Sequence, residues 1–155
     1  MKKTGLLTFL FLALILLPGL RSIAQTYKAD DILGIWYNGE KTSKLQIYKE
    51  NNKYFAKIVW LKTPDDSLTG KPRTDNLNPD EKLRQMPLLG LVVLKNFSFD
   101  GDNEWEGGTI YDPKNGKTYN CYIKFEAFPN LLKIRGYIGV SLLGRTTYWT
   151  KTILL

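Results

Sequence analysis

Short stretches of strand-forming residues, separated by turn residues, dominate the chain from residue 32 onward. Residues 32–37 are rich in apolar and aromatic residues and end at Asn38-Gly39, which is a strong hairpin signal. Residues 44–49 alternate polar with apolar, and residues 54–61 follow after a short turn. Five more stretches of similar character lie at residues 91–97, 105–111, 117–126, 131–138 and 145–152.

This spacing predicts an all-β fold. Eight strands at hairpin distances, without a long amphipathic helix between them, favour a single antiparallel eight-stranded up-and-down barrel. The interior of such a barrel has room for packed side chains or for one small ligand. A β-sandwich is the alternative architecture for the same strand pattern.

One connection is much longer than a hairpin loop. Residues 62–90 contain four prolines and two glycines, and residues 78–84 could form a short helical turn that begins at Pro79. Long ordered loops often carry function, so this segment is either a flexible lid or a plain insertion. We expect it to exchange its amide hydrogens faster than the strands.

The first 24 residues have the layout of a secretory signal peptide. Lys2 and Lys3 precede an apolar run over residues 6–17, and Ser22 and Ala24 supply small residues before a cut. We therefore expect export to the periplasm or the extracellular space, with residues 25–155 as one domain. The first residue after the cut is Gln25 and not Cys, so no lipid acceptor stands there, and we expect no stable membrane anchor after cleavage.

Charge and composition exclude several classes of function. Of the 22 Lys and Arg residues, three lie in the first 24 residues. Residues 25–155 therefore contain 19 basic and 15 acidic residues, which gives a net charge of +4. This modest charge is spread among acids, which argues against nucleic acid as a partner. The chain has no histidine, which excludes Ser-His-Asp catalysis and His-ligated metal sites. We expect no cofactor. Cys121 is expected to be a small buried hydrophobic residue.

Two residues on one predicted strand are candidates for binding an acid. Arg135 and Tyr137 are two positions apart, so both side chains point to the same face, where they could hold a carboxylate together with Tyr119 of the preceding strand. Fatty-acid-binding barrels use a similar Arg-x-Tyr pair. In the alternative interpretation, Leu132 and Ile134 form the core side, and Arg135 points outward.

Several segments carry a family resemblance. Residues 107–119, 132–139 and 143–146, together with residues 31–36, 58–60 and 75–79, are similar to an exported bacterial family known as domain of unknown function 2147. The resemblance covers nearly all of residues 25–155; it implies an exported protein with a lipocalin-like fold and supplies no catalytic residues. It adds ligand-binding candidates at the end of one strand and on the long loop: Trp60, Asp75, Asn78 and Arg84.

Other residues have predicted structural roles. Gly34-x-Trp36 with the late Arg145 resembles the lipocalin arrangement in which an arginine stacks on a tryptophan at one barrel end. The pair Gly107-Gly108 inside a strand predicts a bulge. A tight turn is expected at Asp112, Pro113 and Gly116.

Three functions remain open from the sequence. The first is a binding barrel for a small amphipathic or acidic ligand. The second is an enzyme that uses acids and tyrosines at the barrel mouth without histidine or cofactor. The third is a structural or partner-binding module with a filled barrel. No feature of the sequence predicts the oligomeric state.

Overall fold

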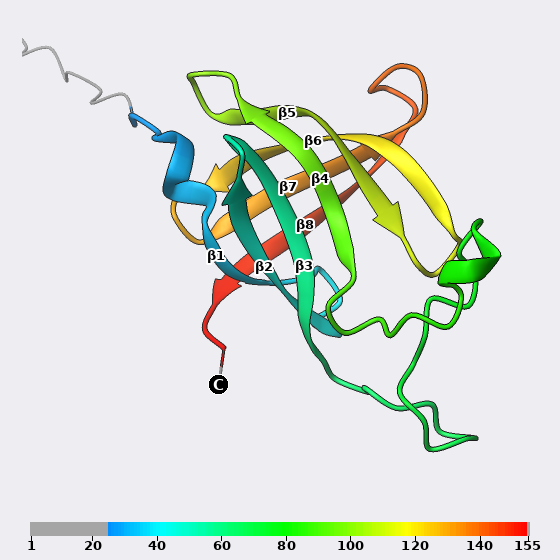
Figure 1. Cartoon of the computed structure of the whole chain (residues 1–155). Helices are drawn as coiled ribbons and strands as arrows, with labels where there is room; N and C mark the ends of the chain where they lie inside the picture. Colours follow the sequence, from blue (N-terminus) through cyan, green and yellow to red (C-terminus); the bar gives the residue numbers. More distant parts are fainter. Residues whose placement is uncertain (1–24, 155) are drawn as a thin grey trace, which may run out of the picture.

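Eight antiparallel strands form a closed barrel in the computed structural model, which describes residues 25–154 (Figure 1). Each strand pairs with the next one in the chain, and β1 closes the ring against β8, with Ile35 opposite Thr152. The predicted up-and-down barrel is confirmed. The strands are β1 (Gly34–Tyr37), β2 (Ser43–Glu50), β3 (Lys53–Leu61), β4 (Val92–Phe99), β5 (Glu104–Asp112), β6 (Lys117–Ala127), β7 (Leu131–Tyr137) and β8 (Gly144–Thr152).

Alternation along the strands decides which side chains enter the barrel. On β6 the buried residues are Cys121, Ile123 and Phe125, and on β7 they are Leu132 and Ile134. Because successive side chains point to opposite faces, the residues between them lie on the outer wall. The burial of Leu132 and Ile134 therefore places Arg135 outside, as the alternative interpretation of this strand had it.

Aromatic side chains fill one end of the barrel. The indole Nε1 of Trp36 donates a hydrogen bond to the carbonyl oxygen of Ile32 at 2.9 Å, and that of Trp105 donates to Ala29 at 3.0 Å. Both acceptors belong to η1 (Ala29–Ile32), the short 3-10 helix that precedes β1. The ring of Phe125 packs between the two indoles, with centroid distances of 6.2 and 5.7 Å. This end is closed by η1 and by packed rings.

The two adjacent glycines of β5 make the predicted bulge. The register of β5 against β6 shifts between Trp105 and Gly108. Gly107 has a φ of +72°, and a Cβ on Gly108 would lie 2.4 Å from the ring of Phe97. Gly108 thus allows the phenyl ring to pack directly against the backbone of β5.

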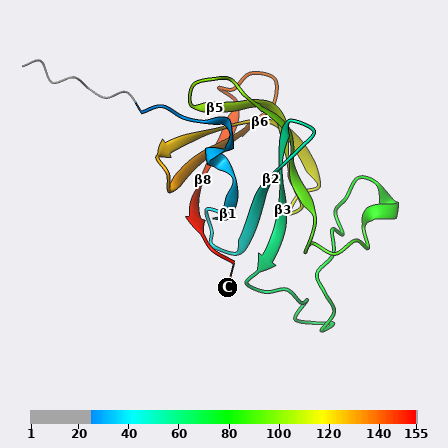
Figure 2. The same cartoon turned by 60° about the vertical axis from the view of Figure 1, so that its left-hand side comes forward.

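The long loop between β3 and β4 lies at the other end of the barrel and extends away from it in Figure 2. It contains a single 3-10 turn, η2 (Glu81–Leu83), and backbone bridges join Asp65 to Pro72 and Thr74 to Pro87. Hydrogen bonds from Asp75 N to Met86 O and from Leu88 N to Arg73 O hold the base of the loop together. The expected helical turn is confirmed at η2, and the loop has a hydrogen-bonded scaffold of its own.

The predicted signal peptide, residues 1–24, lies outside the described residues. Within residues 25–154, no helix has the length and apolar character needed to cross a membrane.

Candidate functional site

The barrel holds a cavity of about 640 Å³ at the end opposite the aromatic plug. Its deep wall is apolar and is formed by inward-facing residues of six strands: Leu45, Ile58, Val93, Ile110, Ile134 and Trp149. Its rim is built by the β1–β2, β5–β6 and β7–β8 loops together with residues 73, 74, 76, 77 and 88 of the long loop. Cavities of about 300 to 1,000 Å³ are typical of small-ligand sites.

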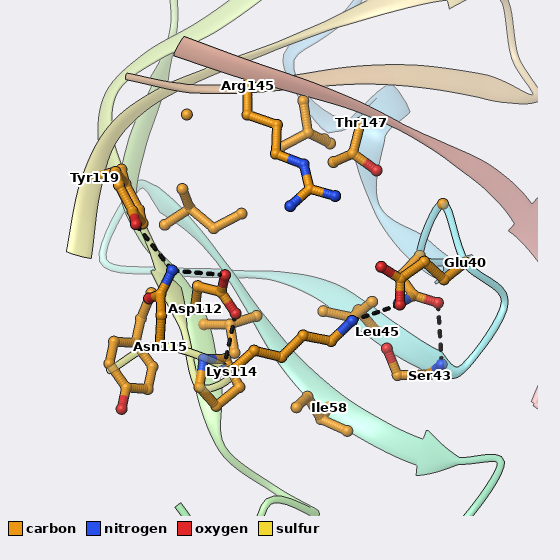
Figure 3. A pocket seen from close by; sticks show the side chains of 18 of the residues that line it. Glu40, Ser43, Leu45, Ile58, Asp112, Lys114, Asn115, Tyr119, Arg145 and Thr147 are labelled. Atoms are coloured by element: carbon orange, nitrogen blue, oxygen red, sulfur yellow. Dashed lines mark hydrogen bonds and ion pairs between the residues drawn. The ribbon is translucent and has the colours of Figure 1, made fainter. Parts of the chain in front are cut away.

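Strand β8 places a cation above the apolar wall. Arg145, Thr147 and Trp149 are spaced by two, so all three line the cavity, with Trp149 buried deep and Arg145 exposed at the rim. Figure 3 shows the guanidinium of Arg145 pointing into the pocket, between Tyr119 on one side and Glu40 on the other. The cavity therefore offers an apolar interior beneath a positively charged group.

An ion pair joins two loops across the rim. The ammonium of Lys114, on the β5–β6 loop, contacts the carboxylate of Glu40 on the β1–β2 loop (Figure 3). The hydrogen bond and the charge of Lys114 lower the pKa of Glu40 below its ordinary value, and the positive charge of Arg145 acts in the same direction. Glu40 is thus ionised at neutral pH, and its ion pair is with Lys114. The other two cations that line the cavity are Arg73 and Arg145.

The β5–β6 turn orients the phenol of Tyr119. Asp112 accepts hydrogen bonds from Lys114 N at 2.9 Å and from the side chain of Asn115, which confirms the predicted turn. Asn115 Nδ2 also donates to the Tyr119 hydroxyl oxygen at 2.9 Å. Pro113 and Tyr119 both line the cavity. The hydroxyl of Tyr119 lines the same pocket as Arg145, and because its oxygen accepts from Asn115, its own proton is available to a ligand.

The long-loop candidates hold the loop and do not face the cavity. The carboxylate of Asp75 is buried and accepts hydrogen bonds from the hydroxyl of Tyr111 and from Asn78 Nδ2, each at 2.7 Å. Arg84 Nε donates to the carbonyl oxygen of Asn78, and its guanidinium pairs with Glu81. The three candidates Asp75, Asn78 and Arg84 therefore form one network, which fixes the loop that borders the mouth.

The structure corrects the hypothesis that Arg135 and Tyr137 bind an acid inside the barrel. Arg135 lies on the outer wall and donates hydrogen bonds to Ser141 O, Leu142 O and Thr146 Oγ1 at 2.8 to 3.1 Å. Tyr137 borders the rim of the cavity, but its ring packs against Tyr122 of the outer wall. The hypothesis chose the wrong face of β7, because Ile134 and Gly136 are the residues that point inward.

Trp60 is also on the outer wall. Its ring lies edge-on to Tyr37, and the ammonium of Lys44 lies 5.2 and 5.5 Å from the two ring centroids. Lys44 Nζ donates to the carbonyl oxygen of Ile153 at 2.9 Å. This cluster attaches the C-terminal segment to the barrel, which gives Trp60 a packing role.

The expected stacking of Arg145 on Trp36 is wrong. The cation over the Trp36 ring is Lys151, whose ammonium lies 5.0 Å from the ring centroid and which is directly opposite Trp36 in the β1–β8 pairing. Gly34, with a φ of +133°, lies against the side chain of Lys151. Arg145 is six residues nearer the mouth of the barrel and is free to line the cavity.

The sequence did not predict that Glu40, Lys114 and Arg145 meet at the rim of the cavity. Lys114 and Glu40 carry no signal, since their contact joins two loops that are far apart in the chain. The role of Arg145 could have been found from its spacing of four from Trp149, because a buried tryptophan identifies the inward face of β8.

The buried thiol is poorly suited to nucleophilic chemistry. Cys121 lies in the core, and burial raises its pKa to about 12. The thiolate, which is the reactive form, is therefore scarce at neutral pH. Within residues 25–154, no group of three or more His, Cys, Asp or Glu side chains is arranged to hold a metal ion.

The family described as "Uncharacterized protein conserved in bacteria (DUF2147)" matches residues 34–151. The chain belongs to this family. The DUF2147 match extends from the first residue of β1 almost to the end of β8, so nearly the whole barrel and every residue that lines the cavity lie within it.

A solved structure of similar fold supports the architecture of this DUF2147 protein. It is protein HP1028 from Helicobacter pylori, described as belonging to the lipocalin family. The identity is 25%, the TM-score is 0.66, and the alignment covers 78% of this chain and 82% of that chain. None of the curated proteins compared with the chain matches it.

Proposed function

We propose that this protein is an exported binding protein whose barrel takes one small ligand with an apolar body and an acidic group. The observation that carries the proposal is the cavity of about 640 Å³, which has an apolar wall and Arg145 directed into its mouth. The lipocalin-like fold supports the same function, since small barrels of this kind can hold one ligand.

The geometry of the cavity predicts the orientation of the ligand. The apolar body would lie against Ile134, Val93 and Trp149, where burial of its surface contributes about 25 cal/mol per Å². The acidic group would then reach the rim, where Arg145 and the hydroxyl of Tyr119 can donate hydrogen bonds to it. A ligand without an acidic group would use only the first of these two interactions.

Export is part of the proposal and rests on residues 1–24 of the sequence. It would place the cavity where it meets ligands outside the cytoplasm. The exported character that the family resemblance implies agrees with this placement.

Titration with dodecanoate tests the site. Trp149 lines the cavity, so its fluorescence should change saturably as dodecanoate binds, and dodecanol serves as the neutral analogue. Arg145→Gln should weaken dodecanoate binding about 10- to 150-fold, which corresponds to the loss of about 1.5–3 kcal/mol for a hydrogen bond to a charged group, and should leave dodecanol binding unchanged. Lys95→Gln is the matched control, because Lys95 is exposed and does not line the cavity.

Two results would contradict the proposal. Absence of saturable binding for both probes would reject the cavity as a site for simple amphiphiles. Equal affinity of the parent and Arg145→Gln for dodecanoate would reject the acid-binding role of the rim.

A further inference from the structure

Four large aliphatic side chains are exposed on the β7–β8 loop, and two of them, Ile138 and Leu143, also line the mouth of the cavity. Ile138, Val140, Leu142 and Leu143 are 66%, 62%, 86% and 72% exposed. In Figure 1 this loop, drawn in orange, extends past the ends of β7 and β8. No acidic residue interrupts it, since the sequence from residue 138 to 144 is Ile-Gly-Val-Ser-Leu-Leu-Gly. Monomeric soluble proteins seldom expose apolar side chains in such a concentrated group.

Part of the backbone of this loop is already hydrogen-bonded within the protein. Arg135 donates to the carbonyl oxygens of Ser141 and Leu142, and the loop closes on itself through Ile138 N to Leu143 O and Leu143 N to Val140 O. Each peptide group that enters an apolar phase without a hydrogen bond is costly. Arg135, which lies on the outer wall of the barrel, therefore provides hydrogen-bond donors for two carbonyl oxygens of the apolar loop.

The rim beside the loop is positively charged. Within the three short loops of the mouth and the strand residues next to them, the two acids are already engaged: Glu40 pairs with Lys114, and Asp112 accepts hydrogen bonds from its own turn. Exposed cations at the same end, besides the paired Lys114, include Lys41, Arg73, Lys117 and Arg145.

We propose that the β7–β8 loop inserts into the surface of an anionic lipid bilayer and turns the mouth of the cavity toward it. The apolar tip would enter the boundary between headgroups and acyl chains, and the rim cations would lie at the level of the headgroups, as in other interfacial segments. A protein partner is less favoured, because stable protein interfaces bury about 800 Å² on each side and a projecting seven-residue loop offers little such surface. The contact is reversible and needs no anchor.

Vesicle binding tests this proposal with the protein that lacks residues 1–24, which retains all eight strands. Flotation with phosphatidylglycerol vesicles should show binding that weakens as salt is added, and phosphatidylcholine vesicles should bind less. The double variant Val140→Ser with Leu142→Ser should bind about 10-fold more weakly or worse, because two apolar side chains no longer enter the lipid. Neither residue lines the cavity, so dodecanoate binding should be unchanged, which separates this test from that of the proposed function.

The matched control removes the same number of exposed aliphatic side chains elsewhere. Ile153→Ser with Leu154→Ser changes the C-terminal segment, away from the mouth, and should bind vesicles like the parent. A fluorophore on Leu142→Cys, with Cys121 too deeply buried to be labelled, should be quenched by lipids that carry a quencher in the acyl chain.

Four results would overturn the proposal. They are no binding of the parent to either vesicle, equal binding by the loop variant, equal affinity for the two lipids, and a label that stays in water. Concentration-dependent dimers that disappear in the loop variant, without vesicle binding, would assign the loop to contact between copies of this chain instead.

Discussion

The hydroxyl of Tyr111 on β5 donates a 2.7 Å hydrogen bond to the buried carboxylate of Asp75 on the long loop. This bond joins a barrel strand to a segment 36 residues earlier in the chain, and burial together with the bond raises the pKa of Tyr111 to about 12. One wall of the cavity mouth is thereby fixed to the barrel.

Tyr111→Phe should weaken the attachment of the long loop between β3 and β4 to the barrel. Asp75 would keep only the side-chain hydrogen bond from Asn78, and a buried acceptor that loses a partner costs about 1–3 kcal/mol. We expect faster amide exchange at residues 73–88 and a lower free energy of unfolding. Tyr148→Phe, on the exposed outer wall, is the control. Unchanged exchange in Tyr111→Phe would show that other contacts hold the loop.

Gly116→Ala should disturb the packing of the long loop against the β5–β6 turn. A Cβ on Gly116 would lie 2.0 Å from the carbonyl oxygen of Leu77, and its φ of +69° is also unfavourable for alanine. Gly139 has the same φ of +69° but no atom within 4 Å of its Cβ position, so Gly139→Ala measures the backbone cost alone, about 1–2 kcal/mol. Thermal unfolding should show the larger loss in Gly116→Ala; equal losses would contradict the contact.

Trp36→Ala should destabilise the barrel by about 3–5 kcal/mol, the usual cost of truncating a buried aromatic side chain. Lys151→Met keeps most of the aliphatic side chain and removes the charge over the indole, which should cost about 0.5–1 kcal/mol. Denaturant unfolding measures both. A change in Lys151→Met as large as that in Trp36→Ala would mean that the cation, and not the packing, stabilises this end.

Alkaline pH should weaken the fold through Cys121. Burial raises the pKa of the folded thiol from its ordinary value of 9.0 to about 12. Between these values the unfolded chain has released the proton and the folded chain has kept it, so the free energy of unfolding falls as pH rises from 9 toward 12. The decline should be shallower in Cys121→Ala. Parallel declines would show that other groups control it.

The mature protein from its native host should begin at Gln25. N-terminal sequencing of protein recovered outside the cytoplasm checks this expectation. A retained Met1 would contradict both the cleavage and the proposed export.

The sequence by itself determined the strands, most of the turns and the all-β barrel, because period-two alternation and turn residues act over a few neighbouring positions. It also identified the bulge at Gly107-Gly108 and the turn at Asp112. Only the tertiary structure decided which face of β7 points inward, since Arg135 and Ile134 both fit a strand and closure of the ring selects between them. The cavity rim was decided in the same way: Glu40, Lys114 and Arg145 come from three loops or strand ends that meet only when β1 pairs with β8.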